Sequence, residues 1–431
     1  MSGKLATGFE VRRSAAQRLQ LVLGGAPFVP FGQKDLDDAR DRALANRLVT
    51  LTLKRHGQIN YVLDQVLDKG LPKRSGLFEA SMRLAITQLL FLPETGDHAA
   101  IHLAVEVIKK DRRAGRFAKL ANAILRKVQR DISPEQLAAE QLAPQWMYQK
   151  WLEQYGDERT ARMLDAILEE APLDLSFKPE TTDGVAAVSG ITTHGQSARV
   201  VVRDAAVDQL SGYDSGEWWV QDLAASLPVQ LAGPQKGQSA LDICAAPGGK
   251  TAQLAAAGMD VVAVDNDGAR MERVKENLER LQLDARLIVA DATELSAEQQ
   301  FDLVVLDAPC SATGTFRRHP EVIWHRKEKD IRSRAELQKQ MLAQAAHLVK
   351  PGGTLIYCTC SLEQEEGEEQ AQQFLADHAK FELNEITSSE FSTLPDVICA
   401  NGFLRTLPGM AVSGVSGSLD GFFAARFVRS V

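Results

Sequence analysis

The stretch that decides the fold is Leu241-Asp242-Ile243-Cys244-Ala245-Ala246-Pro247-Gly248-Gly249-Lys250-Thr251, where a short apolar run leads into a loop of small residues. Small residues let a backbone approach a ligand closely, and a helix that follows such a loop presents its N-terminal N–H groups to the ligand. We therefore expect a strand, a cofactor-binding loop and a helix in succession. The candidate contacts in the loop are Cys244, Ala245, Ala246, Pro247, Gly248, Gly249 and Lys250.

The end of this loop, Gly249-Lys250-Thr251, also matches the end of a Walker A phosphate-binding loop. That pattern requires a glycine five residues before Gly249, and the sequence has Cys244 there. ATP binding is therefore disfavoured.

Short apolar strands alternate with helical stretches after Gly237. The predicted strands are Leu241–Cys244, Val261–Val264, Leu287–Val289, Leu303–Leu306 and Thr354–Cys358, and the helical candidates include Arg270–Leu281 and Arg334–Leu348. This alternation predicts an α/β domain with a parallel, doubly wound sheet of the Rossmann type. Ligands of such sheets bind beyond the carboxyl ends of the strands, so the loops there should carry the chemistry.

Acidic residues stand at three of these strand ends, namely Asp265, Asp291 and Asp307. An acid about twenty residues beyond a glycine-rich loop accepts hydrogen bonds from ribose hydroxyls in nucleoside-binding folds, which fits Asp265. Taken singly, each would more often be a helix cap or a turn residue. Together with the loop they favour a cofactor that contains adenosine.

Two cysteines follow predicted strands, Cys310 in Asp307-Ala308-Pro309-Cys310-Ser311 and Cys360 in Thr359-Cys360-Ser361. A buried cysteine is usually only a small hydrophobe, and we read Cys244, Cys358 and Cys399 in this way. For Cys310 and Cys360 the position after a strand favours a functional role. The five cysteines are an odd number without the spacing of zinc pairs, so we expect neither a disulfide framework nor a metal site.

The first part of the chain has a different character. Apolar residues repeat at helical spacing from Val11 to about Arg130, as in Ala15, Leu19, Val22 and Leu23, which predicts an all-α domain over residues 1–132. We assign residues 133–235, with a helix over Trp146–Ile167 and a β-like piece over Ala198–Val202, to a linker and N-terminal extension of the next domain. Residues 236–431 form the predicted catalytic domain.

Charge divides along the same line. Residues 1–130 hold 23 Lys and Arg against 12 Asp and Glu, or +11, so the rest of the chain carries −19 of the total of −8. The densest basic stretch is 101–130, with nine positive residues. Such a patch attracts phosphate, although a solvated helix face has the same composition. The acidic run Glu363–Glu369 is typical of a helix start.

Of the 431 residues, 45% are hydrophobic and 25% charged, which is ordinary globular usage. No apolar run reaches the roughly 20 residues that a membrane span needs, and the N-terminus does not resemble a signal peptide. We therefore expect a cytoplasmic protein without membrane contact.

The three motifs Cys244–Thr251, Asp307–Ser311 and Thr359–Ser361 resemble motifs I, IV and VI of the RNA cytosine-5 methyltransferases, most closely the bacterial Fmu/Sun group. The strings Trp219–Asp222 and Asp420–Ala424 also lie where that family has similar ones, and the basic helical region resembles its NusB-like RNA-binding domain. Leu175-Ser176-Phe177-Lys178 departs from an Arg-x-Asn string that many members have, which puts a role of this segment in RNA binding in doubt.

The resemblance implies a class I methyltransferase domain that uses S-adenosyl-L-methionine to methylate carbon 5 of a cytosine in 16S ribosomal RNA, free or partly assembled, and a monomeric protein. It also implies that Cys360 is the nucleophile, that Cys310 assists product release and that Asp307 contacts the cytosine. From the chemistry alone, Cys310 and Cys360 are exchangeable. Two alternatives stay open: a methyltransferase of transfer RNA, and a non-catalytic RNA-binding assembly factor.

Overall fold

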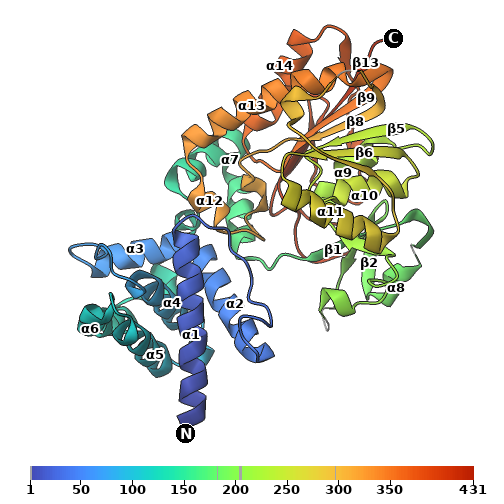
Figure 1. Ribbon diagram of the computed structural model, residues 1–431. Coiled ribbons are helices and arrows are strands. Elements are labelled where there is room, and N and C mark those ends of the chain that lie inside the picture. Colours follow the sequence, from blue (N-terminus) through green and yellow to red (C-terminus); the bar gives the residue numbers. More distant parts are fainter. Residues whose placement is uncertain (1, 182, 203–205, 297) are drawn as a thin grey trace. The chain divides into compact units, whose positions relative to one another are not determined.

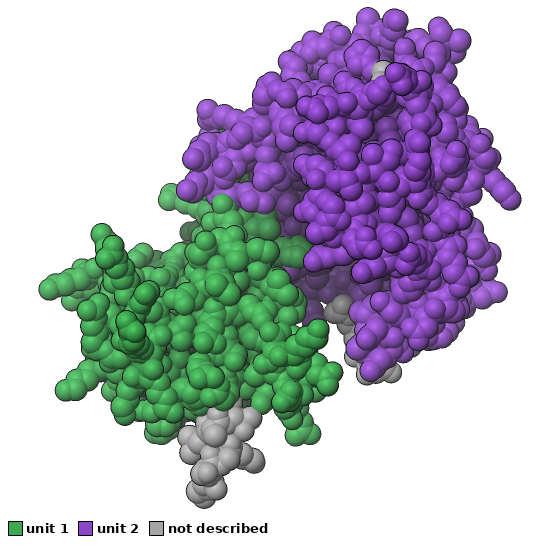
Figure 2. All heavy atoms as spheres, viewed as in Figure 1, with its two compact units in different colours: residues 1–168, 319–325 green, residues 169–318, 326–431 purple. Residues whose placement is uncertain are grey.

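The computed structural model describes residues 2–181, 183–202, 206–296 and 298–431, with side chains from residue 8 onward. The chain folds into two compact units (Figure 2). A helical unit contains the residues up to Leu168 together with His319–His325, and an α/β unit contains Glu169–Arg318 and Arg326–Val431.

The helical unit is built from amphipathic helices whose apolar stripes face inward, as their spacing predicts. Its α-helices are α1 (Ser2–Leu23), α2 (Ala39–Lys54), α3 (His56–Val66), α4 (Phe78–Phe91), α5 (Asp97–Lys110), α6 (Ala118–Asp131), α7 (Gln145–Leu168) and α12 (Val322–His325) (Figure 1). Ala15 and Leu19 of α1 and Leu125 of α6 are fully buried. The prediction of an all-α N-terminal domain is therefore confirmed.

The segment His319–His325 belongs to this unit although it lies far along the chain. Glu321 accepts a hydrogen bond from the backbone N–H of Phe28 at 3.0 Å, and the ring of Trp324 lies 4.7 Å from that of His56. The sequence pattern gave no indication of this return.

The α/β unit opens with a small antiparallel sheet in the order β2-β3-β1-β4. Its strands are β1 (Leu173–Phe177), β2 (Gly190–His194), β3 (Ser197–Val200) and β4 (Trp218–Val220). Only β3 overlaps the piece that the sequence predicts. Leu175 and Phe177, in the segment that departs from the family pattern, are buried in the core of this sheet.

The main sheet has the order β11-β12-β13-β9-β8-β5-β6-β7, with β10 paired to β13. Its parallel strands are β5 (Ser239–Ile243), β6 (Asp260–Asp265), β7 (Arg286–Val289), β8 (Phe301–Asp307) and β9 (Val349–Thr359). They overlap all five predicted strands. The antiparallel strands β10 (Phe381–Leu383), β11 (Ile398–Ala400), β12 (Phe403–Thr406) and β13 (Phe422–Arg429) extend the sheet beyond β9 and were not predicted.

Helices cover both faces of the main sheet (Figure 1). The helices of this unit are α8 (Gly184–Ala187), α9 (Leu223–Ala232), α10 (Gly249–Ala256), α11 (Gly268–Leu281), α13 (Glu328–His347) and α14 (Glu368–Asp377). Val304 and Leu306 of β8 pack with residues of α13, whereas Leu303 and Val305 pack with residues of α9 and α10. Alternate side chains of one strand therefore enter two cores, which confirms the doubly wound arrangement.

The boundary between the two units lies between Leu168 and Glu169, so α7 belongs to the helical unit. This division does not test where RNA-binding and catalytic functions begin, and the boundaries at 132/133 and 235/236 stay predictions. Among the described residues, no helix is both long enough and apolar enough to cross a membrane.

Candidate active site

A cavity of about 370 Å³ lies at the carboxyl ends of the parallel strands, where the fold is expected to bind its ligand. Its walls come from the loops after β5, β6, β7, β8 and β9 and from helices α11 and α13. The predicted site residues among its lining are Cys244, Ala246, Pro247, Asp265, Asp291, Asp307, Cys310 and Cys360. The sequence therefore predicted residues that the fold does bring together.

The loop after β5 has a backbone that only small residues permit. Gly248 has φ of +99°, and a Cβ atom added there would lie 3.1 Å from Cγ1 of Val274. A Cβ atom on Gly249 would lie 3.2 Å from the amide carbon of Gln221. A side chain at Gly248 would strain the backbone, and one at Gly249, where α10 begins, would require the side chain of Gln221 to shift.

Asp265, the last residue of β6, is fixed at the cavity by this loop. Its carboxyl group accepts hydrogen bonds from the backbone N–H groups of Ala246 and Asp267, each at 3.1 Å. Arg270, which the sequence analysis did not single out, lies 3.4 Å from the same carboxyl group and donates to the carbonyl of Ala246 at 2.7 Å. The side chain of Asp265 is 2% exposed, so the surrounding loop holds it in place.

Asp291 lies after β7 and combines a local role with its place at the cavity. It caps a short turn by accepting hydrogen bonds from the N–H and hydroxyl groups of Thr293 at 2.8 and 2.7 Å. These bonds lower the pKa of Asp291. Asp291 is therefore a cap residue, as such acids often are, and it also lines the cavity.

Lys250 is paired with Asp307, a residue of the cavity lining. Its Nζ atom lies 2.8 Å from Oδ2 of Asp307 and 4.9 Å from the centre of the Phe422 ring. Burial is the largest single influence on the pKa of Lys250 and lowers it, but the nearby negative charges, Asp307 first among them, and the hydrogen bond to Asp307 together outweigh burial and raise the pKa overall. Ala245, Gly248, Gly249 and Lys250 are not among the described lining residues, and their assignment as cofactor contacts stays a prediction.

Cys310 and Cys360 lie side by side although 50 residues separate them in sequence. Their sulfur atoms are 3.5 Å apart, Cys310 is buried and Cys360 is partly exposed. The hydrogen bond to Cys360, together with burial, raises the pKa of Cys310 well above its usual value. Cys310 is therefore held as a thiol that can donate toward the sulfur of Cys360.

The other cysteines differ in their surroundings. Cys358 is fully buried in β9, where burial raises its pKa, and its sulfur lies 3.7 Å from Oδ1 of Asp307. Cys244 lines the cavity, with a pKa that burial also raises. Cys399 lies in β11, outside the cavity lining.

An arginine pair that sequence reasoning missed fastens the loop beyond Cys310. Arg317 donates to Asp420 at 2.7 Å and lies 3.5 Å from Asp222, and Arg318 pairs with the same two acids. Asp222 and Asp420 belong to the two strings outside the motifs that resemble the family. The structural role of these two acids is to bind Arg317 and Arg318 and so to hold the loop that follows Cys310.

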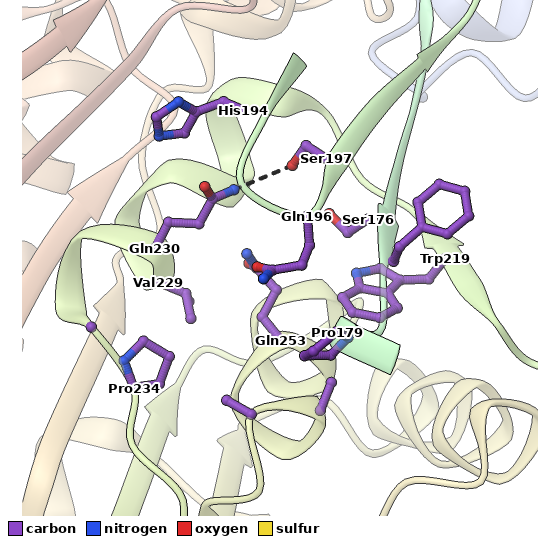
Figure 3. Close-up of a pocket in the computed structure, with 14 residues that line it drawn as sticks. Ser176, Pro179, His194, Gln196, Ser197, Trp219, Val229, Gln230, Pro234 and Gln253 are labelled. Carbon is purple, nitrogen blue, oxygen red and sulfur yellow. Dashed lines mark hydrogen bonds between the residues drawn. The ribbon is translucent and has the colours of Figure 1, made fainter. Parts of the chain in front are cut away.

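A second cavity, of about 570 Å³, lies between the small sheet and helices α9 and α10 (Figure 3). It is lined by the amides of Gln196, Gln230 and Gln253 and by the ring of Trp219. None of its described lining residues is a cysteine, a carboxylic acid or a lysine. The groups suited to methyl transfer are therefore in the first cavity.

The basic stretch of the helical unit is exposed. Nine basic residues lie on α5, on α6 or between them, and all but one are exposed. The exposed ones are Lys109, Lys110, Arg112, Arg113, Arg116, Lys119, Arg126 and Arg130, and Lys127 is half-buried. The apolar residues Ala121, Ile124 and Leu125 of α6 face the core instead. Both interpretations of this stretch, a phosphate-binding surface and a solvated face, agree with the exposure.

Solved structures share the fold. A protein named PH0851 matches with a TM-score of 0.78 at 23% identity, covering 97% of this chain and 98% of that one. NSun6 from Pyrococcus horikoshii, solved with SFG, matches with a TM-score of 0.57 at 17% identity, covering 67% of this chain and 98% of that one. The α/β unit thus has the fold of S-adenosylmethionine-dependent methyltransferases.

The cavity suits this cofactor. Its volume falls within the range of about 300–1,000 Å³ that small-molecule sites occupy. Asp265 and Asp291 offer carboxyl oxygens to hydroxyl and ammonium groups, and Leu337 and Met341 offer apolar surface to a ring. The lining of the cavity therefore fits S-adenosylmethionine.

Sequence comparisons identify the family. The model of the family "16S rRNA methyltransferase RsmB/F" matches residues 229–428, and that of the NusB family matches residues 16–130. "Ribosomal RNA small subunit methyltransferase B" of Yersinia pestis bv. Antiqua (strain Angola) is 34% identical over 402 residues, which cover 88% of this chain and 92% of that protein. The chain belongs to the RsmB/F family of methyltransferases and carries a NusB domain at its N-terminus.

Proposed function

We propose that this protein methylates carbon 5 of a cytosine in 16S ribosomal RNA through a transient covalent bond between Cys360 and carbon 6 of the base. The observation that carries the proposal is the pair of sulfur atoms of Cys310 and Cys360, 3.5 Å apart beside the cavity. A methyltransferase that acts on a more nucleophilic atom has no need of one cysteine there, and still less of two.

The chemistry explains why a thiol is needed. Carbon 5 of cytosine is a poor nucleophile, and addition of a thiolate at carbon 6 makes it electron-rich. When bound, S-adenosylmethionine supplies the electrophilic methyl group. A base then removes the proton from carbon 5, so that the electrons return to the ring and the thiolate leaves carbon 6.

The surroundings of the two cysteines favour Cys360 as the nucleophile. The raised pKa of Cys310 keeps it a thiol, and its hydrogen bond stabilises negative charge on the sulfur of Cys360. Cys360 is also the more exposed of the two and so the more accessible to a base. Cys310 then serves in product release.

Asp307 and Lys250 form the polar wall next to the cysteines. The side chain of Asp307 is 32% exposed and lines the cavity, whereas that of Lys250 is 7% exposed and pairs with it. We assign to Asp307 the contact with the amino group of cytosine, and to Lys250 the task of holding that carboxylate in place.

The RNA substrate must present an unstacked cytosine, since neither sulfur can reach a base within a duplex. The exposed lysines and arginines of α5 and α6 provide positive charge for the phosphates. Incompletely assembled 16S ribosomal RNA offers such unstacked bases.

Bisulfite sequencing tests the proposal. RNA from a strain that lacks the gene should lose one protected cytosine in 16S ribosomal RNA, and wild-type protein should restore it whereas Cys360→Ala should not. A protected position lost from transfer RNA instead would favour the transfer RNA methyltransferase. Unchanged protection throughout would favour the non-catalytic assembly factor.

A further inference from the structure

The acidic run after Cys360 contains acids that precede helix α14, and Glu366 is the one whose carboxyl group connects the two cysteine loops. The helix α14 does begin with Glu368 and Glu369 in its first turn, but Glu366 precedes it and is fully buried. Buried carboxyl groups require hydrogen-bond donors, and Glu366 has them in Ser311 and Gln338, which are distant in sequence, and in the nearer Ser361.

Both oxygens of the Glu366 carboxyl group accept hydrogen bonds, and they share the backbone N–H of Ser311, which lies 2.9 Å from Oε1 and 3.2 Å from Oε2. Oε1 accepts from the backbone N–H of Ser311 at 2.9 Å and from the side-chain amide of Gln338 at 3.0 Å. Oε2 accepts from the hydroxyl of Ser361 at 2.6 Å and from the hydroxyl of Ser311. One carboxyl group thus joins the loop after β8 to the loop after β9.

The two serines are the residues that directly follow the two cysteines. Ser311 follows Cys310, and Ser361 follows Cys360. A displacement of the carboxyl group would move both loops and would change the distance between the two sulfur atoms.

Glu366 is itself held in place from the core. Its carbonyl oxygen accepts a hydrogen bond from the hydroxyl of Tyr357 in β9 at 2.7 Å, and Gln338 of α13 also donates to the carbonyl of Pro309 at 3.0 Å. The carboxyl group therefore rests on two rigid elements of the sheet and its covering helix.

We infer that Glu366 is a positioning residue that sets the separation of the sulfur atoms of Cys310 and Cys360. Glu366 acts through Ser311 and Ser361. The inference rests on the proposed function only where it concerns methyl transfer. The length of its side chain matters most, because the carboxyl group must reach both loops at once. Glu366→Asp keeps the acid but withdraws it by one methylene, whereas Glu366→Gln keeps the length.

The first measurement is independent of methylation. Phenylarsine oxide condenses with two nearby thiols to form two As–S bonds and one water, so its affinity reports whether the thiols lie close together. Glu366→Asp should bind it at least about tenfold more weakly than wild type, while Glu366→Gln should stay closer to wild type. Cys310→Ala and Cys360→Ala identify the bridged pair, since each should abolish this binding.

The second measurement is methyl transfer. Glu366→Asp should lower kcat about 100-fold, in line with the cost of misplacing reacting groups by about 1 Å, with KM for RNA within about twofold of wild type. Glu366→Gln should lose less. The matched control is Glu369, an exposed acid on α14, whose Asp and Gln variants should behave as wild type in both assays.

The outcomes separate the two proposals. Wild-type protein that binds the arsenical but does not methylate RNA would contradict the proposed function and leave the arsenical test of Glu366 intact. Glu366→Asp with wild-type kcat and wild-type arsenical affinity would overturn the inference. If circular dichroism shows that Glu366→Asp is unfolded, the double variant Ser311→Ala, Ser361→Ala removes both hydroxyl donors, and unchanged values for it would equally overturn the inference.

Discussion

Three polar side chains at the cavity are held in place by a hydrogen bond or an ion pair with a neighbouring group. Asp265 is held by the backbone of the loop after β5, Asp307 by Lys250, and Cys310 by the sulfur of Cys360. Buried polar groups cost free energy unless they are paired, so these partners fix each group in one position. A site made in this way is ready for its ligands before they arrive.

The first prediction concerns Asp265. Hydrogen bonds to a charged acceptor contribute about 1.5–3 kcal/mol, so Asp265→Ala should weaken S-adenosylmethionine binding about 10- to 100-fold. Calorimetric titration measures this, with Asp260→Ala, an exposed acid at the start of the same strand, as the control. An unchanged dissociation constant would show that another residue binds the ribose.

The second prediction concerns Asp242, which lies beneath the loop in β5. It is fully buried, and its Oδ2 atom accepts a hydrogen bond from the hydroxyl of Thr251 at 2.6 Å, whereas its Oδ1 atom has no hydrogen-bond partner among the described residues. Burial raises the pKa of Asp242 from 3.8 to about 7, although the bond from Thr251 lowers it. Between these two values the folded protein binds a proton that the unfolded chain has released.

Stability should therefore fall as pH rises from about 4 to about 7 and then level off. Asp242→Asn removes this dependence, so wild type should lose about 2.5 kcal/mol relative to the variant between pH 5 and pH 7.5. Urea unfolding at several pH values measures the difference, with Asp260→Asn as the control. Parallel pH profiles for wild type and Asp242→Asn would contradict the raised pKa.

Among the elements, those that local pattern determines were predicted and those that distant contacts determine were not. The strands β5 to β9 are short apolar runs bounded by turns, and the stripe of α6 repeats at helical spacing. The burial of Glu366 depends on Ser311, 55 residues away, and composition alone is typical of an exposed helix start. The strands β10 to β13 are short or follow loops without a regular repeat, so pairing within the sheet defines them: β13 pairs with β9, β10 and β12 pair with β13, and β11 pairs with β12.

The same reasoning applies to the site. Motif positions after strands brought Cys310, Cys360 and the three acids to one cavity, because parallel strands end at the same edge. The roles of Arg270, Arg317 and Arg318 follow only from the fold, since arginines are common on surfaces and nothing in their spacing distinguishes them.

The third prediction concerns α6. Arg126, Lys127 and Arg130 lie on its outer side, so the triple change to Gln should weaken RNA binding and lower the slope of log affinity against log salt by about 0.7 per lost phosphate contact on single-stranded RNA. Filter binding at several salt concentrations measures this. Lys275→Gln, an exposed lysine of α11, is the control. An unchanged slope would favour the solvated-face interpretation.

In the molecule as a whole, charge and chemistry are divided between the two parts of the sequence. Residues 1–130 carry +11 and the remainder −19, so we expect the part that contains the NusB domain to attract RNA phosphates. Because His319–His325 packs within the helical unit, a truncation would strip contacts from Trp324. Substitutions on α6 therefore test this division of labour more cleanly than removal of the domain.

The central claim is that Cys360 adds to the base and that Cys310 is needed to release it. The most direct measurement is denaturing electrophoresis of each cysteine variant after incubation with 16S ribosomal RNA and S-adenosylmethionine. Cys310→Ala should stall after methylation and run as a protein–RNA adduct that survives denaturation, whereas Cys360→Ala should form none. An adduct with Cys360→Ala and none with Cys310→Ala would reverse the two roles, and no adduct with either variant would contradict covalent catalysis by this pair.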